Sequence, residues 1–397
     1  MTTLIFSVML LAKIALLALT LPGTLELLIL TLAALSSKKC QVLDRTPDKS
    51  ILPRLAVVIP AHNEAEGISA CLANLLVSLK QTTGCALVVI ADNCQDTTAD
   101  MAAKAGARVL VRHDEVKRGK GYALDYAFTM LLAENFDGFL VIDADSQVDE
   151  ALISDFQYAF NQGIDALQCR YRIANPEQSR RASLQHLAWL AFNDLRLLGR
   201  ERLKVSVGIL GNGFGLSRRV LETVPYEAGS IAEDMEYHLR LVNAGFKVRF
   251  LESVTVYSDA PNQDANAAVQ RTRWEGGRFR LIFDHVPDLF RAVLRGKLNL
   301  LEPLAELLLL PLAFHVVLLA LTLLIPIAGL QYYAGAALVL VFAHVLIAIV
   351  LGGGGLKDIK ILAGVPIYIL WKLTLLPKLW SNSRQNATWQ RTDRENL

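Results

Sequence analysis

Two aspartates, Asp143 and Asp145, come directly after the apolar run Phe-Leu-Val-Ile at 139–142. Such a run with two β-branched residues predicts a strand buried on both faces of a sheet. Side chains two residues apart on an extended segment point to the same side, so both carboxylates can bind one cation. Their hard oxygen ligands favour Mg²⁺ or Mn²⁺ on a diphosphate. The alternative is an ordinary acidic turn after a strand.

Predicted strands and helices alternate around this run, from residue 51 to residue 299. The strands are at 55–59, 87–90, 108–112 and 139–142, and the helices at 61–79, 97–105 and 123–132. This alternation predicts an α/β domain with a mostly parallel sheet and right-handed crossovers.

Polar side chains stand at the carboxyl ends of three of these strands. Pro60 ends the first strand and Glu64 follows it, Asp92 comes shortly after the second, and Asp143 and Asp145 follow the fourth. Open α/β sheets bind their ligands at this edge. We therefore expect these residues to converge on one crevice, and the residue types favour a nucleotide site.

Two common phosphate-binding motifs are absent from the sequence. The dinucleotide fingerprint would directly follow the first strand, where residues 60–64 read Pro-Ala-His-Asn-Glu without a glycine. Residues 118–121, Arg-Gly-Lys-Gly, lack the earlier glycine and the Ser/Thr of a P-loop. Lys120 lies between two glycines and can still approach a phosphate closely. The alternative is a solvated loop lysine.

A glycine-rich segment at 208–219 surrounds another short predicted strand. Glycines in a strand indicate close approach of a ligand or of another backbone. This segment contains Gly211, Asn212 and Gly213, which makes it a candidate wall of the same crevice.

Two further clusters lie downstream. Glu233 and Asp234 open a predicted helix, where acidic residues are commonly caps. A base that deprotonates a hydroxyl must, however, also be a carboxylate or a histidine within hydrogen-bond reach. Gln270, Arg273 and Trp274 follow; the arginine offers a planar fork for phosphate oxygens and the tryptophan a flat face. A basic patch at a membrane surface is the alternative.

Four apolar stretches predict contact with a membrane, at 4–35, 304–330, 334–351 and 361–380. The first three are long enough to span a bilayer, which takes about 20 residues per helix. The fourth carries lysines and aromatic residues at one level, which is typical of an interfacial or re-entrant helix, with a fourth span as the alternative. Lysines after the first stretch and arginines in the tail favour the cytosolic side for both.

Composition excludes some classes of protein. The formal net charge of +2 argues against a nucleic-acid partner. The five cysteines are scattered without a C-x-x-C pair, which argues against a zinc site or a disulfide scaffold and is compatible with a reducing compartment.

In type and order, these residues resemble the membrane-bound family-2 glycosyltransferases with a GT-A fold. That group includes cellulose, chitin-oligosaccharide and hyaluronan synthases and ceramide glucosyltransferases. Its motifs are an aspartate after the second strand, D-x-D, E-D and Q-x-x-R-W. The matching residues here are Asp92, Asp143 with Asp145, Glu233 with Asp234, and Gln270 with Arg273 and Trp274. The resemblance covers roughly residues 55–278 and implies a Rossmann-like GT-A domain.

The resemblance also implies roles. The UDP-sugar donor would be bound by Pro60, Glu64, Asp92, Lys120, Asp143, Asp145, Gln270, Arg273 and Trp274. Asp145, with Asp143, would hold Mg²⁺ or Mn²⁺. Asp234, with Glu233 beside it, would be the catalytic base. The acceptor would contact Gly211, Asn212, Gly213 and Trp274.

The expected division of the chain follows from these assignments. It has an N-terminal transmembrane helix, a GT-A domain, a transmembrane hairpin, an interfacial helix and a basic cytosolic tail, at 1–37, 51–299, 300–352, 359–381 and 382–397. A bacterial inner membrane, with the catalytic domain in the cytosol, is the expected location.

Two departures from the polymer synthases bear on function. Ala232 stands where they usually have the threonine of T-E-D, and three spans are few for a polymer pore. Both favour an inverting transfer of a Glc- or GlcNAc-type sugar to a lipid-linked or oligosaccharide acceptor, in glycolipid or exopolysaccharide biosynthesis. A processive polysaccharide synthase and a non-catalytic sugar-nucleotide-binding subunit remain the alternatives.

Overall fold

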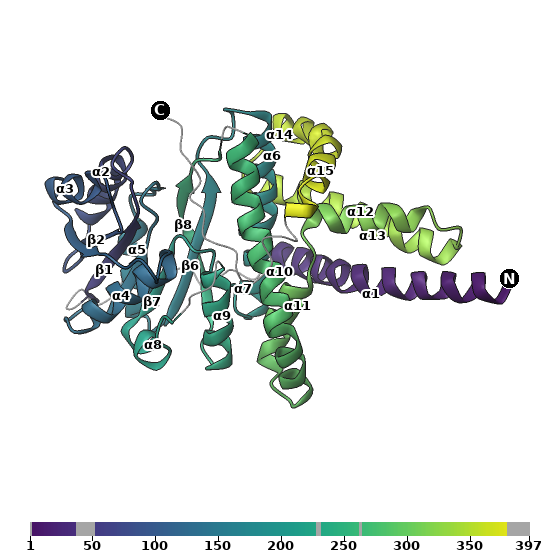
Figure 1. Ribbon diagram of the computed structural model, residues 1–397, viewed down its shortest axis with the longest axis horizontal. Coiled ribbons are helices and arrows are strands. Elements are labelled where there is room, and N and C mark those ends of the chain that lie inside the picture. Colours follow the sequence, from purple (N-terminus) through teal and green to yellow (C-terminus); the bar gives the residue numbers. More distant parts are fainter. Residues whose placement is uncertain (1, 37–51, 228–231, 262–263, 379–397) are drawn as a thin grey trace.

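The computed structural model describes residues 2–36, 52–227, 232–261 and 264–378. Figure 1 shows an α/β domain on one side and a group of long helices on the other. The lysines after the first apolar stretch and the basic tail at 382–397 lie outside the described residues.

Eight strands form one mixed sheet in the order β3-β2-β1-β4-β7-β6-β8-β5. They are β1 (Leu55–Ala61), β2 (Ala86–Asp92), β3 (Arg108–Arg112), β4 (Gly138–Val141), β5 (Gln147–Val148), β6 (Ala166–Ile173), β7 (Phe214–Ser217) and β8 (Val248–Ser258). The first four strands are parallel, as the sequence predicted. In the other half, β7 runs antiparallel to both neighbours and β5 antiparallel to β8, so that half of the sheet is mixed.

Helices cover both faces of the sheet. They are α2 (Ile68–Leu79), α3 (Thr98–Lys104), α4 (Lys120–Leu132), α5 (Leu152–Asn161), α6 (Arg180–Trp189), the π-helical η1 (Leu190–Leu195), α7 (Arg196–Leu203), α8 (Arg218–Thr223) and α9 (Glu233–Asn243). Alternate residues of β1 enter two different hydrophobic clusters, Leu55 and Val57 on one face and Ala56 and Val58 on the other. This explains why the strand is apolar throughout.

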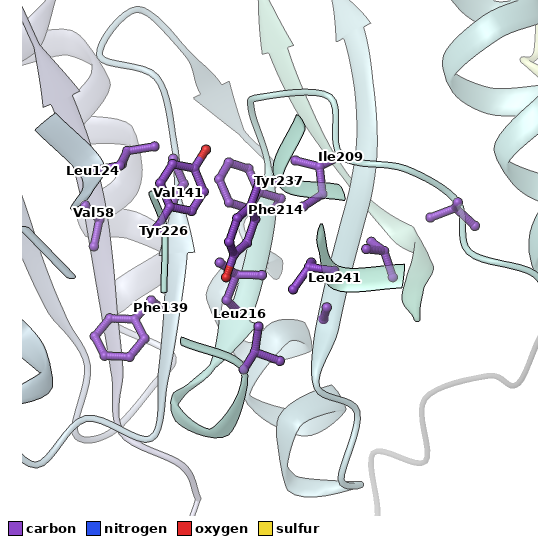
Figure 2. Close-up of a cluster of buried hydrophobic side chains, with 14 of the residues drawn as sticks. Val58, Leu124, Phe139, Val141, Ile209, Phe214, Leu216, Tyr226, Tyr237 and Leu241 are labelled. Carbon is purple, nitrogen blue, oxygen red and sulfur yellow. The ribbon is translucent and has the colours of Figure 1, made fainter. Parts of the chain in front are cut away.

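One of the two clusters contains an aromatic group close to the site described below. Phe214 of β7 and Tyr237 of α9 pack around Tyr226, whose ring centroid lies 4.4 Å from that of Tyr237 (Figure 2). The Tyr237 hydroxyl donates a hydrogen bond of 2.6 Å to the carbonyl oxygen of Val224. The group holds the first turns of α9 against the end of the sheet.

We call the remaining helices the membrane part, because two of them are long and apolar enough to cross a membrane. They are α1 (Thr2–Leu35), α10 (Asp264–Leu294), the 3₁₀ turn η2 (Leu298–Leu300), α11 (Leu301–Leu308), α12 (Leu312–Leu323), α13 (Ala328–Leu351), α14 (Leu356–Ile361), the 3₁₀ turn η3 (Leu362–Gly364) and α15 (Val365–Leu373). In Figure 1, α1 and the α12–α13 hairpin project in the same direction, and α10 runs across their base.

The described helices include two that are long and apolar enough to cross a membrane, Leu10–Leu35 and Ala328–Leu351. The stretch predicted to span at 304–330 is instead bent by 74° between α11 and α12, so it counts as a third span only if both pieces are taken together. Pro311 at the bend cannot donate a backbone hydrogen bond, and it is the N-cap residue just before α12. The fourth apolar stretch is divided among α14, η3 and α15.

Close contacts and buried polar pairs bind α1 to the rest of the protein. A Cβ on Gly199 of α7 would lie 2.5 Å from the carbonyl oxygen of Leu30, so the two helices can approach this closely only at a glycine. On the other side, the Thr31 hydroxyl lies 2.7 Å from Nδ1 of His344 in α13. Small residues and hydrogen bonds of this kind are what join helices within membranes.

Glu26 of α1 is a charged group within a predicted span, and it is paired. Its Oε1 lies 2.8 Å from Arg196 Nη2 and 2.9 Å from Arg200 Nη2. Arg200, which is 1% exposed, also lies 2.5 Å from Glu302 of α11 through Nε. These ion pairs join α1, α7 and α11, so Glu26 connects the membrane part to the α/β domain.

We expect the Glu26→Gln variant to lose about 3 kcal/mol of unfolding free energy, because two buried guanidinium groups lose a charged partner. Thermal unfolding of the detergent-solubilised protein measures this as a lowered midpoint. The control is Glu222→Gln, which removes the exposed Arg218–Glu222 pair with N···O 3.3 Å and should cost less than about 1 kcal/mol. Equal midpoints for the two variants would contradict the assignment.

Candidate active site

The D-x-D segment follows the carboxyl end of β4, and contacts from two other segments hold it there. Asp143 donates its backbone N–H to Asn212 Oδ1 at 3.1 Å, and its carboxylate forms an ion pair with Lys120. The Lys120 ammonium also donates a hydrogen bond of 2.6 Å to the carbonyl oxygen of Gly211. One lysine thus joins three segments: the start of α4, the end of β4 and the glycine-rich loop before β7.

Lys120 keeps its positive charge in this environment. Burial lowers the pKa of its ammonium, but the carboxylates of Asp143 and Glu233 outweigh burial, and the pKa is raised above its ordinary value. Gly119, before it, has a φ of +123°, a conformation that L side chains rarely adopt. The Arg-Gly-Lys-Gly segment therefore presents a fixed cation beside the two aspartates.

Asp92 at the end of β2 is also part of a buried ion pair. Its Oδ1 lies 2.6 Å from Arg112 Nη1 at the end of β3, and each of these side chains is 8% exposed. Its backbone carbonyl lies 2.7 Å from His62 Nδ1, in the loop after β1. The pairing fixes the carboxylate at the rim of the crevice.

Glu233 and Asp234 begin α9 and face the glycine-rich loop. A Cβ on Gly211, whose φ is +79°, would lie 3.1 Å from Asp234 Oδ2. Burial, together with the neighbouring Asp234, raises the pKa of Glu233 from 4.5 to about 7. Burial likewise raises the pKa of Asp234. Near neutral pH the pair can therefore hold or release a proton, which is what a general base requires.

The Q-x-x-R-W residues lie on the first turns of α10. Their spacing of i, i+3 and i+4 puts Gln270, Arg273 and Trp274 on one face of the helix. The Trp274 ring is packed in a row of aromatic side chains, with its centroid 6.1 Å from that of Trp189, which is in turn 4.5 Å from Tyr171. The row fixes Trp274 between the sheet and the membrane helices.

One continuous cavity of about 2480 Å³ brings these residues together. All of the candidate residues predicted from the sequence line it except Asn212 and Gly213. Asn212 is buried and holds the Asp143 backbone, with its amide Nδ2 2.8 Å from Ser146 Oγ. Gly213 packs on Cys169, whose Sγ would lie 2.5 Å from a Cβ added at that glycine. These two residues therefore support the cavity wall from behind.

The cavity continues beyond the polar end into the membrane part. Its far end is lined by apolar side chains of α12 and α13, among them Leu312, Val316, Leu338, Val341 and Phe342. Typical pockets for small ligands have volumes of roughly 300–1,000 Å³, so this cavity can hold more than a nucleotide sugar.

The donor set at the polar end fits a magnesium or manganese ion bound together with a phosphate ligand. Asp143 and Asp145 supply carboxylate oxygens from one edge of the cavity. Among the described residues, no three His, Cys, Asp or Glu side chains are grouped as a complete metal site. Mg²⁺ is commonly held by one or two carboxylates, with phosphate oxygens and water completing its coordination, so two aspartates are sufficient.

Some residues of the site were not predicted from the sequence. Arg112 was only the last residue of a predicted strand, yet it is the partner of Asp92 across the parallel pair of β2 and β3. The parallel register could have revealed this, because it puts the two residues opposite each other. Trp189 and Tyr171 had no local signal, since they come from a helix and a strand far from α10 in sequence.

The pKa of Glu233 leads to a pH dependence of stability. Between about pH 4.5 and 7 the folded protein retains a proton that the unfolded chain has lost, so the unfolding free energy should fall as pH rises through this window. The Glu233→Gln variant should lose this slope and gain stability relative to the unaltered protein at pH 8. Unfolding midpoints measured from pH 5 to pH 8 check the prediction, and parallel curves for the two proteins would contradict it.

Comparisons with known proteins agree with this geometry. The family model described as "Glycosyltransferase like family 2" matches residues 53–277. The probable glycosyltransferase YdaM of Bacillus subtilis (strain 168) is 23% identical over 249 residues, which are 60% of this chain and 59% of YdaM. The low-salt glycan biosynthesis hexosyltransferase Agl6 of Haloferax volcanii is 38% identical over 81 residues, which are 20% of this chain and 19% of Agl6. The matched segments thus cover less than two thirds of each of these two relatives.

A solved structure shares the fold over nearly the full length. The mannosyltransferase PcManGT from Pyrobaculum calidifontis, in complex with GDP-Man and Mn²⁺, superposes with a TM-score of 0.56 and 18% identity. The superposition covers 94% of this chain and 97% of PcManGT, so it includes most of the helices outside the α/β domain as well as the sheet. With the family model matching more than half of the sequence, this protein belongs to glycosyltransferase family 2 and has a GT-A fold.

Proposed function

We propose that this protein is an inverting, metal-dependent glycosyltransferase that moves a sugar from a UDP-sugar to a hydroxyl of a lipid-linked or oligosaccharide acceptor. The reaction takes place at the cytosolic face of a membrane, the inner membrane of a bacterium, in glycolipid or exopolysaccharide biosynthesis. The observation that carries the proposal is the cavity itself, in which the aspartates that follow β4, the acidic pair of α9 and the arginine and tryptophan of α10 face the same space.

The polar end of the cavity accommodates the donor. Glu64 and the Asp92–Arg112 pair lie at the rim where the nucleoside would bind, and Lys120 lies beside the D-x-D carboxylates where the diphosphate would bind. Asp143 and Asp145 would hold Mg²⁺ or Mn²⁺, which supplies Lewis-acid stabilisation of the departing diphosphate.

Asp234 is the group we assign as base. It takes the proton of the acceptor hydroxyl while the acceptor oxygen forms its bond to the anomeric carbon and the bond from that carbon to the diphosphate oxygen breaks. A single displacement of this kind inverts the anomeric configuration. The UDP leaves with both electrons of the broken bond, and Lys120 and Arg273 stabilise its negative charge.

The apolar end of the cavity supports an acceptor with a hydrocarbon portion. A nucleotide sugar alone has no use for a space lined by leucine, valine and phenylalanine between α12 and α13. A lipid-linked acceptor would place its tail there and its hydroxyl near Asp234. This arrangement favours one transfer, or a few, over the continuous extrusion of a polymer.

We expect Asp234→Asn to reduce transfer by about 10²- to 10⁴-fold, because the acceptor hydroxyl loses its base, while metal-dependent binding of UDP is retained. Asp145→Ala should reduce transfer and should also weaken metal-dependent binding of UDP. Turnover assays and UDP titrations with and without Mn²⁺ separate the two effects. Glu236→Gln, on the same helix but outside the cavity lining, serves as the control and should retain activity. Near-normal turnover by Asp234→Asn would show that the base is another group.

The donor and acceptor classes are tested with a panel of UDP-sugars and GDP-mannose. The detergent-purified protein is supplied with Mn²⁺, with and without membrane lipid extract, and the products are sized. We expect release of UDP that depends on added lipid, with the label in a small extractable product. A long ladder of products without added lipid would instead favour a processive synthase, and binding without transfer to any acceptor would favour a non-catalytic subunit.

A further inference from the structure

The helix α15 contacts α10 beside the arginine and tryptophan of the candidate site. In Figure 1, α15 lies at the top of the membrane part, next to α6 and α12. Its exposed residues Ile367 and Leu370 are apolar, whereas Tyr368 and Lys372 face inward and line the cavity. The helix therefore has one face available to the bilayer and another directed at the site.

Two contacts join α15 to α10. Lys372 Nζ lies 2.6 Å from Glu275 Oε1, with the side chains 6% and 9% exposed. One turn away along both helices, Arg271 Nη2 donates a hydrogen bond of 2.9 Å to the Tyr368 hydroxyl. Residues four apart lie on one face of a helix, so Arg271 and Glu275 on α10 face Tyr368 and Lys372 on α15. We call these two parallel contacts the ladder.

Two contacts one turn apart determine more than one contact would. A single contact lets one helix rotate or slide about that point. Two contacts fix both the rotation of α10 about its axis and its position along α15. On α10, Arg273 and Trp274 lie between Arg271 and Glu275 in sequence. Trp274 is one residue from Glu275, about 100° around the helix, whereas Arg273 is two residues from both contact residues, about 160° around the helix. The ladder therefore sets the angle at which these two side chains enter the cavity.

The Lys372–Glu275 pair depends on both partners. The second carboxylate oxygen of Glu275, Oε2, is buried and has no hydrogen-bond partner among the described residues. The Lys372 ammonium also lies 5.0 Å from the ring centroid of Phe314 in α12, within the range of a cation–π contact. Lys372 thus lies between α10 and α12, and its charge compensates that of Glu275.

We infer that Lys372, Tyr368, Glu275 and Arg271 are positioning residues, by which α15 holds Arg273 and Trp274 in the orientation that transfer requires. This inference rests on the proposed function. Loss of either contact should leave the donor site on the sheet intact, because Asp92, Lys120 and Asp143 are held by contacts of their own.

The experiment compares three variants. Tyr368→Phe removes one hydrogen bond without leaving a buried charge. The pair Lys372→Met with Glu275→Gln removes both charges together, because removal of one alone would leave the other uncompensated. Lys372→Arg keeps the charge. Asp288→Asn is the matched control, since it removes an exposed ion pair with Arg291, 2.7 Å long, on the same helix α10.

We expect the first two variants to lower kcat by about 10- to 100-fold, the size of effect that a displacement of roughly 1 Å can have. The unfolding midpoint should stay close to that of the unaltered protein. The donor KM and the metal-dependent affinity for UDP should change far less than kcat, because most of the donor contacts are on the sheet. Lys372→Arg should retain most of the activity, and Asp288→Asn all of it.

Other outcomes separate a failure of this inference from a failure of the proposed function. If Tyr368→Phe and the double variant turn over like the unaltered protein, the ladder has no positioning role and the inference is wrong. If kcat falls only in proportion to a lowered unfolding midpoint or a loss of UDP affinity, the contacts are structural and the inference is again wrong. If the unaltered protein binds UDP but transfers no sugar to any acceptor tested, the proposed function itself fails.

Discussion

Repulsion among carboxylates is the constraint on which the rest of this site depends. Asp143, Asp145, Glu233 and Asp234 all line one cavity, and each is partly shielded from water. Buried like charges can coexist only if cations offset them or protons neutralise them. The structure uses both devices, because Lys120 pairs with Asp143 and the pKa of Glu233 is raised to about 7. Binding of a divalent cation would add to the same balance.

The need for a fixed cation explains the unusual backbone around the site. Lys120 reaches Asp143 and the carbonyl oxygen of Gly211 from the first residue of α4, and Gly119 before it has a positive φ. Gly211 also has a positive φ, and its lack of a Cβ leaves room for the carboxylate of Asp234 beside it. The sequence predicted that glycines here mark close approach of a ligand or of another backbone. In the structure they let charged side chains from different segments meet.

The residues that could be predicted are those whose position follows from a single strand, because they stand at its carboxyl end. Asp92 and Asp143 were predicted to converge because parallel strands end at the same edge, and both line the cavity. Contacts between distant elements were out of reach. The bend between α11 and α12 was not predicted, since hydropathy reports length and not direction. The same holds for Trp189 beside Trp274, and for Asn212, whose amide supports the backbone and whose residue type gave no indication of burial.

The candidate site is therefore built in two halves that the chain holds by different means. The donor half belongs to the sheet, where parallel strands and buried ion pairs such as Asp92–Arg112 hold each carboxylate. The other half is presented by α10, which connects the sheet to α11 and whose first turns are held by side chains of α15. A displacement of the membrane helices would move Arg273 and Trp274 and leave Asp143 in place. Alignment of the two halves thus depends on how the membrane part docks on the domain. That docking relies on the Glu26 ion pairs with α7 at one side and on α15 at the other.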